Sequence, residues 1–383
     1  MPSSRSWRPV VGLLAASLTL CLASAAHAQL RVGVTNLVTD NQAANPGQFT
    51  DPGLVNAWGL SYSPTSPFWV SSNGPGTATL YTVNPATQAT TKSALVVTIP
   101  DGQVTGQVFN SAGVGSFGGD NFLFVGEAGT ISGWRGALGT TAEVLTTSTA
   151  GAVYKGAAFA TVAGNGYLYA ADFHNGAIDV LKGNAASVDL AGQFIDPNLP
   201  SGFAPFNIQN LAGTIYVTYA QQDGAKHDEV AGAGLWFVSS FDTQGKFLGR
   251  VASGGTLDAP WGLALAPSSF GALAGSLLVG NFGDGRINVF DATTHAFEGQ
   301  LAATDGSPLS IDGLWALAPG NDGGAGSSAS LYFTAGPDGE SHGVLGVLTP
   351  QAIAAVPEPS VALLLVAGLA GVLARRRGAA RPL

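Results

Sequence analysis

The chain has 383 residues, of which 54 are glycine and only 10% are charged, and its formal net charge is −9. Soluble helical proteins carry roughly a quarter charged residues, so this composition excludes an extensively helical fold. Because 46% of the residues are apolar, the chain can bury a large core, which excludes global disorder. The length allows either two domains or one large all-β unit.

The N-terminus, residues 1–28, is predicted to be a signal peptide. Two arginines precede an apolar run from Val10 to Leu22, and Ala26-His27-Ala28 supplies the small-residue pattern that signal peptidase accepts. We expect cleavage between Ala28 and Gln29. The alternative is a transmembrane anchor, which is disfavoured because the run is shorter than the ~20 residues that a membrane span needs.

The C-terminus, residues 353–383, combines three features. Val356-Pro357-Glu358-Pro359-Ser360 is followed by an uninterrupted run of apolar or small residues over 361–374 and then by Arg375-Arg376-Arg377. The combination resembles the PEP-CTERM sorting signal of Gram-negative bacteria. The resemblance implies transient anchoring in the inner membrane, cleavage by an exosortase near the Pro-Glu-Pro motif, and release to the cell surface or the exopolysaccharide matrix. A permanent anchor is the alternative, and the shortness of the apolar helix disfavours it.

Removal of both ends changes the electrostatics of the chain. Six of the 15 basic residues lie at the ends, and residues 29–358 keep the other nine together with all 24 acidic residues, so this part of the chain carries a net charge of −15. Such a surface repels nucleic acid and anionic lipid. We therefore expect no nucleic-acid partner. Signal peptidase and exosortase are the expected processing partners. The body is expected to be a monomer that binds a polysaccharide or a surface protein.

The body, residues 29–352, is predicted to be an all-β, six-bladed β-propeller of four-stranded antiparallel blades. Six segments repeat one plan: a small-residue inner strand, an apolar strand that ends in a polar residue, and a third strand that follows a glycine. Trp58-Gly59-Leu60 of the first copy, for example, matches Trp261-Gly262-Leu263 of the fifth. Inner strands are expected to start near residues 57, 109, 155, 205, 260 and 313, a period of roughly 50 residues that is typical of propeller blades.

The sixth copy shows only three clear strands. We expect residues 32–38 to supply its fourth strand and so to close the ring, which removes exposed sheet edges. A pair of β-sandwiches and a seven-bladed or irregular ring are the alternative architectures. Trp58, Trp261 and Trp315 occupy equivalent positions and are expected to be core residues rather than sugar-stacking residues.

Two resemblances bear on the body. The segment Gly285-Arg286-Ile287-Asn288-Val289-Phe290-Asp291 is similar to NHL-type repeats and to the lactonase and streptogramin-lyase propellers. Residues 36–41 and 51–59 resemble a bacterial family of conserved hypothetical proteins that often carry the same sorting tail. This second resemblance covers nearly all of the body and implies a propeller and an export route, without an established activity.

Polar residues concentrate in the loops between second and third strands and before the inner strands, which emerge on one face of a propeller. The candidate ligand or metal residues there are Asn56, Asp172, His174, Asn207, Asp258, Asn281, Asp284 and Asp312. The same loops also hold Asn73, Glu127, His227, Asp228 and Glu340. If several of these side chains point inward, they form an oxygen-rich ring of the type that Ca²⁺ or Mg²⁺ prefers.

Each of these residues also has an ordinary structural explanation. Asp-Gly and Asn-Gly pairs, such as Asp284-Gly285, are common hairpin turns that need no ligand. The polar excursion 221–229 in the fourth copy is either a binding loop or a solvated one.

The catalytic residues are unknown, because the chain has no G-x-S-x-G, H-E-x-x-H or P-loop motif. The sequence favours an exported, non-enzymatic binding or scaffold protein. The alternative is a divalent-metal-dependent hydrolase or lyase that resembles the propeller lactonases.

Overall fold

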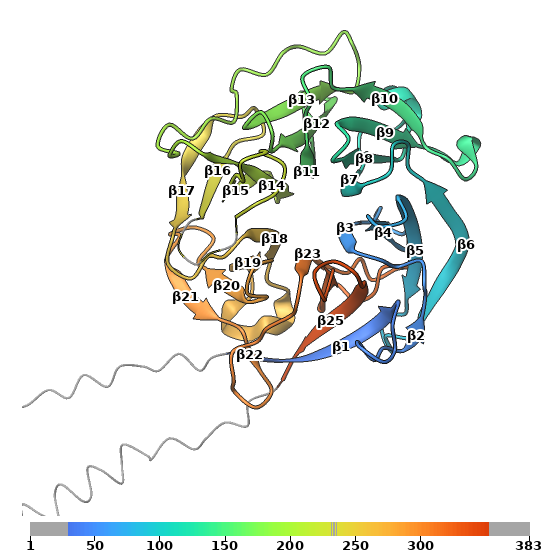
Figure 1. Ribbon diagram of the computed structural model, residues 1–383, viewed down its shortest axis with the longest axis vertical. Helices are drawn as coiled ribbons and strands as arrows, with labels where there is room; N and C mark the ends of the chain where they lie inside the picture. Colours follow the sequence, from blue (N-terminus) through green and yellow to red (C-terminus); the bar gives the residue numbers. More distant parts are fainter. Residues whose placement is uncertain (1–29, 231, 233, 235, 352–383) are drawn as a thin grey trace, which may run out of the picture.

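The structure is a computed structural model that describes residues 30–351 apart from 231, 233 and 235. Within this range the regular elements are β-strands and short 3-10 helices, and the strands form six sheets that radiate around a central axis (Figure 1). The prediction of an all-β, six-bladed propeller is confirmed. The predicted signal peptide (1–28) and sorting segment (353–383) lie outside the described residues. In the described part, no helix has the length and apolar character needed to span a membrane.

The first strand of each blade lies nearest the central axis (Figure 1). The first blade contains β3 (Ala57–Ser61), β4 (Phe68–Ser72), β5 (Thr77–Val83) and β6 (Thr90–Thr98), and the second contains β7 (Val104–Phe109), β8 (Phe122–Gly126), β9 (Thr130–Trp134) and β10 (Glu143–Thr147). The third contains β11 (Tyr154–Val162), β12 (Asn165–Asp172) and β13 (Ala177–Lys182), and the fourth contains β14 (Phe203–Leu211), β15 (Thr214–Gln221), β16 (Phe237–Phe241) and β17 (Phe247–Ser253). The fifth contains β18 (Pro260–Leu265), β19 (Leu277–Asn281), β20 (Ile287–Phe290) and β21 (Phe297–Gln300). The 3-10 helices η1 (Gly113–Gly115), η2 (Phe117–Gly119), η3 (Gly136–Leu138) and η4 (Ser268–Leu273) lie in connecting loops.

The sixth blade joins the two ends of the body. It consists of β23 (Leu314–Pro319), β24 (Leu331–Ala335) and β25 (Val344–Pro350), followed in space by β1 (Arg31–Thr39), with the short β2 (Phe49–Thr50) and β22 (Ala302–Ala303) paired to β1. Strand β1 is antiparallel to β25, from the pair Val32–Pro350 to the pair Thr39–Val344. The expected closure by the N-terminal strand is confirmed.

The third blade departs from the predicted plan because its sheet has three strands. After β13 the chain leaves the sheet and crosses to the fourth blade, where the N–H groups of Gly192 and Phe194 donate to the carbonyls of Gln244 and Gly245 at 2.9 Å. A Cβ atom at Gly192 would lie 2.2 Å from the carbonyl carbon of Gly245, so this crossing depends on glycine.

Glycine also sets how closely the inner strands pack around the axis. A Cβ atom at Gly59 in β3 would lie 2.3 Å from the carbonyl oxygen of Thr105 in β7, and one at Gly262 in β18 would lie 2.6 Å from the carbonyl oxygen of Trp315 in β23. The glycine of the repeated Trp-Gly-Leu motif is therefore a site of contact between neighbouring blades.

The predicted start of the second inner strand is wrong. Residue 109 is the last residue of β7, not its first. The strand was missed because Thr105, Gly106 and Gln107 interrupt the apolar pattern, yet Gln107 is buried and its Nε2 donates to the carbonyls of Gly59 at 2.9 Å and Trp69 at 2.6 Å. A buried amide that bonds to the neighbouring blade gives no apolar signal in the sequence.

Candidate functional site

Lys155, at the start of β11, lies at the centre of a polar cluster on the face where the inner strands begin. Its side chain is 1% exposed, and its Nζ donates to Glu127 Oε1 at 2.5 Å and to Asp228 Oδ1 at 3.0 Å. The ammonium also lies 5.5 Å from the ring centroid of Trp58, within range of a cation–π contact. Residues from the first four blades therefore meet at one lysine.

Amide side chains extend this cluster to the first and sixth blades. Asn56 Nδ2 donates to Glu340 Oε2 at 2.7 Å, and Asn73 Nδ2 donates to Glu127 Oε2 at 3.2 Å. Asn56 in turn accepts a hydrogen bond from Trp315 Nε1 at 2.9 Å, and its φ of 47° is one that asparagine tolerates better than most residues. We call Lys155, Glu127, Asp228, Glu229, Glu340, Asn56 and Asn73 the Lys155 cluster.

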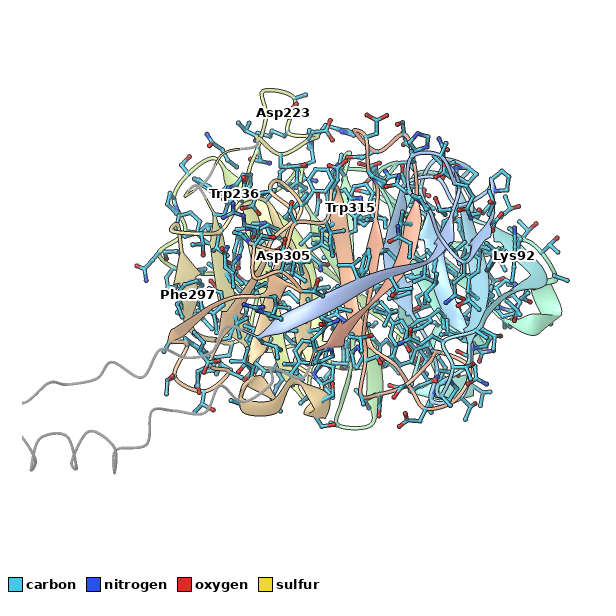
Figure 2. The ribbon with its side chains drawn as sticks, turned by 90° about the horizontal axis from the view of Figure 1, so that it is seen from below. Lys92, Asp223, Trp236, Phe297, Asp305 and Trp315 are labelled. Atoms are coloured by element: carbon cyan, nitrogen blue, oxygen red, sulfur yellow. The ribbon has the colours of Figure 1, made fainter. Side chains whose placement is uncertain are left out.

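The excursion 221–229 brings acidic residues of the fourth blade to the cluster. Asp223 lies at the upper rim of the disc when the propeller is seen edge-on (Figure 2). Its N–H donates to the carbonyl of Asp228 at 2.8 Å, and its Oδ1 accepts from the N–H of His227 at 2.9 Å. The loop thus folds back on itself, and His227 Nδ1 lies 3.0 Å from Asp228 Oδ1.

Carboxyl groups outnumber cations in the Lys155 cluster. Burial opposes the charged form of Lys155, but the charges of Glu127 and Asp228 outweigh it, so the pKa of the ammonium is raised. Burial, together with the neighbouring carboxylates, raises the pKa of Glu340 and raises that of Glu229 to about 7. At neutral pH the lysine is therefore charged, and Glu229 loses its proton at a higher pH than an ordinary glutamate does.

Aromatic rings lie inward of the cluster along the axis. The rings of Trp58 and Trp315 stack with centroids 3.8 Å apart, and Phe282 stacks on Trp315 at 4.0 Å. Trp261 Nε1 donates to the carbonyl of Lys155 at 3.0 Å. All three tryptophans are buried, so their prediction as core residues is confirmed.

Sequence reasoning missed Lys155. The signal for it is a single charge at the start of a strand whose other residues are apolar or small, since a lysine is almost never fully buried unless it is paired. Its partners could not be named from the sequence, because Glu127 and Asp228 are 28 and 73 residues away.

Of the eight sequence-predicted ligand residues, Asn56 belongs to the Lys155 cluster. Two others, Asn281 and Asp284, bond to each other within the fifth blade, where Asn281 Nδ2 donates to Asp284 Oδ1 at 2.8 Å. Asn281 also donates to the carbonyl of Thr256 at 2.8 Å and accepts from Asn288 Nδ2 at 3.1 Å. These groups tie one blade together.

Asp172 and His174 lie in the turn after β12. Asp172 Oδ1 accepts from the N–H of Asn175 at 3.0 Å, and its Oδ2 accepts from Asn175 Nδ2 at 2.7 Å. The carbonyl of His174 accepts from Gln222 Nε2 at 3.2 Å. The carboxylate thus stabilises a turn, as the structural explanation of these residues supposes.

The remaining three residues lie apart from one another. Asn207 Nδ2 donates to the carbonyl of Trp261 at 2.7 Å inside the channel. Asp258 Oδ1 accepts from the N–H of Gly232 at 3.2 Å, and Asp312 Oδ2 accepts from the N–H of Asp338 at 2.8 Å. Asp258 and Asp312 each hold a loop, so the expected oxygen-rich ring is replaced at the channel mouth by the Lys155 cluster.

Two residues of the cluster and the neighbouring His227 form a group that resembles a metal site. Glu127, His227 and Asp228 each offer a ligand atom, and these atoms lie within 4.8 Å of one another. However, Lys155 Nζ already contacts both carboxylates, and its positive charge repels a cation placed between them. While Lys155 keeps these contacts, the group does not fit Ca²⁺ or Mg²⁺.

No family model matches the chain. The uncharacterised protein R648 of Acanthamoeba polyphaga mimivirus is 32% identical to it over 323 residues, which cover 80% of this chain and 76% of that protein. The chain belongs to the R648 family. A second uncharacterised mimivirus protein, L690, is 31% identical over 318 residues, 79% of this chain and 82% of its own. These relatives are viral, so the bacterial family expected from the sequence stays a prediction.

Solved structures share the fold. An auxiliary nutrient binding protein from Bacteroides ovatus aligns with a TM-score of 0.53 and 13% identity, covering 85% of this chain and 78% of its own. A glucose dehydrogenase aligns with a TM-score of 0.50 and 13% identity, covering 83% and 99%. At such identities the likeness shows a β-propeller and nothing about activity.

Proposed function

We propose that this member of the R648 family is a non-enzymatic binding module, and that the Lys155 cluster recognises a ligand rich in hydroxyl groups or carrying positive charge. The excess of carboxyl groups over cations at the channel mouth is the observation that supports this. Carboxylates accept hydrogen bonds from sugar hydroxyls and from ammonium groups, and charge-assisted bonds of this kind are stronger than neutral ones.

The state of Lys155 supports binding rather than catalysis. A catalytic lysine acts as a base or nucleophile when its pKa is lowered toward neutrality. Here two carboxylates raise the pKa of the ammonium, so Lys155 is a fixed charge that orients Glu127 and Asp228.

Calorimetric titration of the purified protein with soluble oligosaccharides tests this proposal. A cationic chitosan oligosaccharide and a neutral cello-oligosaccharide are expected to bind, with binding weakened about tenfold by Glu340→Gln, whereas an anionic oligogalacturonate is not. If only the anionic oligosaccharide bound, the proposal would be wrong. Tight binding of Ca²⁺ that is lost in Glu127→Gln would instead favour the metal-dependent hydrolase.

We also propose that the protein is exported from a Gram-negative cell, anchored briefly in the inner membrane and released to the cell surface or matrix. The sequence patterns of residues 1–28 and 353–383 and the net charge of −15 over residues 29–358 support this. Replacing Pro357-Glu358-Pro359 or Arg375–Arg377 with alanines should leave uncleaved protein in the inner membrane. Release at the unchanged rate would contradict the proposal.

A further inference from the structure

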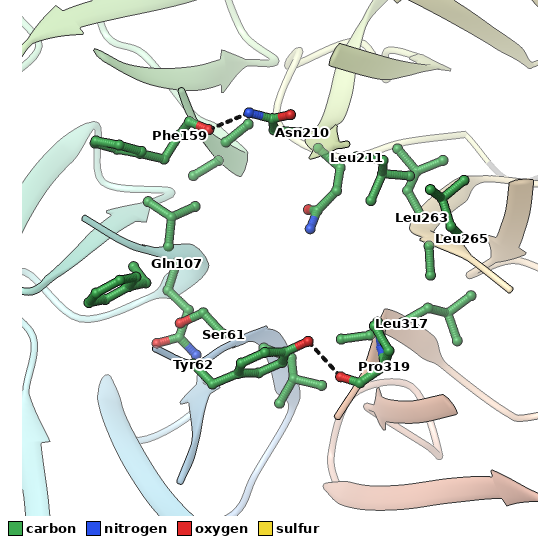
Figure 3. A pocket seen from close by; sticks show the side chains of 18 of the residues that line it. Ser61, Tyr62, Gln107, Phe159, Asn210, Leu211, Leu263, Leu265, Leu317 and Pro319 are labelled. Atoms are coloured by element: carbon green, nitrogen blue, oxygen red, sulfur yellow. Dashed lines mark hydrogen bonds between the residues drawn. The ribbon is translucent and has the colours of Figure 1, made fainter. Parts of the chain in front are cut away.

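The propeller has a second opening on the face opposite the Lys155 cluster. There the ends of the six inner strands surround a cavity of about 380 Å³ (Figure 3). This volume lies at the lower end of the roughly 300–1,000 Å³ found for small-molecule sites. Because each inner strand runs from one face to the other, this cavity and the Lys155 cluster are at opposite ends of the same channel.

The channel is narrow between its two ends. Beyond the cavity, Gly59, Gln107, Asn207 and Trp261 are among the residues around a void of about 10 Å³, which has room for about one water molecule. The stacked tryptophans lie further along the axis. A ligand in the cavity therefore enters from this face alone and does not reach Lys155.

The wall of the cavity is uncharged and mostly apolar. Apolar surface comes from several blades, through Leu263, Leu265, Leu317 and Phe159 (Figure 3). Leu60 also lines the cavity. Among the described residues that line it, none is acidic, basic or histidine. A charged ligand would lose its hydration here without gaining a partner, so the wall favours a neutral ligand.

Polar groups on opposite walls remain free to bind such a ligand. Gln209 of β14 forms no side-chain hydrogen bond with any described residue, so its amide offers both donors and an acceptor. Ser61 of β3 also lines the cavity, and its hydroxyl has no partner in the described part of the chain. The first and fourth blades, which carry them, lie across the ring from each other (Figure 1).

Other polar residues of the wall are already paired and make it rigid. Tyr62 donates to the carbonyl of Pro319 at 2.6 Å, and Asn210 Nδ2 donates to the carbonyl of Phe159 at 2.8 Å (Figure 3). Burial raises the pKa of Tyr62 to about 12, so the phenol stays neutral and keeps its acceptor lone pairs.

We propose that this cavity binds a neutral, amphipathic small molecule of the glycoside type, with a sugar-like group that meets Gln209 and Ser61 and an apolar substituent that packs on the leucines. This site is separate from the Lys155 cluster and does not depend on the function proposed for it.

Calorimetric titration of the purified protein with n-hexyl β-D-glucoside tests the proposal. One molecule is expected to bind per chain with a Kd below about 1 mM. The matching glucuronide, which differs by one carboxylate, should bind at least tenfold more weakly because the wall offers no counter-charge.

Two variants and a control locate the site. Gln209→Leu should weaken binding of the glucoside about tenfold and Gln209→Trp should abolish it, and neither removes a hydrogen bond of the fold. Gln244→Leu, at an exposed glutamine of the same blade that does not line the cavity, should leave glucoside binding unchanged. Absence of glucoside binding by the unaltered protein, or binding that survives Gln209→Trp, would overturn the proposal.

Discussion

The role of Lys155 as the centre of its cluster leads to a prediction about stability. Lys155→Met keeps most of the side-chain volume and removes the charge between Glu127 and Asp228. Removing one partner of a buried ion pair costs about 3–5 kcal/mol, because the other partner is left buried without compensation. The Glu127 side chain is 9% exposed, so its carboxylate stays buried without a partner in the variant. The Asp228 side chain is 63% exposed and can turn toward solvent. We therefore expect a loss of about 3 kcal/mol, at the lower end of the range.

Thermal unfolding followed by circular dichroism measures this loss. With an unfolding entropy of ~2 cal/mol/K per residue over a body of about 320 residues, 3 kcal/mol corresponds to a fall of about 4–5 °C in Tm. Lys182→Met is the matched control, because Lys182 pairs with Asp189, whose side chain is 92% exposed, and its loss should leave Tm nearly unchanged. Adding Glu127→Gln to Lys155→Met should restore part of the loss. Equal changes in Tm for the two lysine variants would refute the reasoning.

Three further predictions concern charge, packing and closure. The pKa of Glu229 is raised from its usual 4.5 to about 7, so its ionisation destabilises the folded protein as pH rises from about 4.5 to 7. Glu229→Gln should therefore raise the free energy of unfolding by about 1–2 kcal/mol at pH 8 and leave it unchanged at pH 4. Urea unfolding at both pH values measures this difference. Gly59→Ala should lower stability by about 2 kcal/mol or more in urea unfolding, whereas Gly136→Ala, where a Cβ meets no atom within 4 Å, should not. Val38 is buried in β1 beside β25, so Val38→Asp should increase the rate of amide hydrogen exchange in β25 more than in β8. An equal increase in all blades would contradict this.

The architecture could be predicted because its signals are local and repeated. The match between Trp58-Gly59-Leu60 and Trp261-Gly262-Leu263 gives the repeat, and the missing strand of the sixth copy predicts the closure by β1. Strand β7 was misplaced because its buried Gln107 is polar. The shortened third blade was missed because the departure of the chain toward Gly245 depends on a contact with another blade.

The candidate site could be predicted only in part. The sequence places Asn56, Glu127 and Asp228 in loops of one face, which is correct, but it cannot distinguish Asp284, which bonds within its own blade, from Glu127, which faces the channel. Both residues follow a strand and sit in polar turns. The difference lies in their partners, and Lys155 is distant from Glu127 in the sequence.

The pairing of β1 with β25 also has a kinetic consequence. These strands are the first and last of the described chain, so the sixth blade cannot be completed until the whole body has been synthesised. Contacts between such distant segments form slowly, because a large loop must close before they are gained. A chain of this design keeps an incomplete sixth blade until β25 has been made, so this blade is the last to be completed.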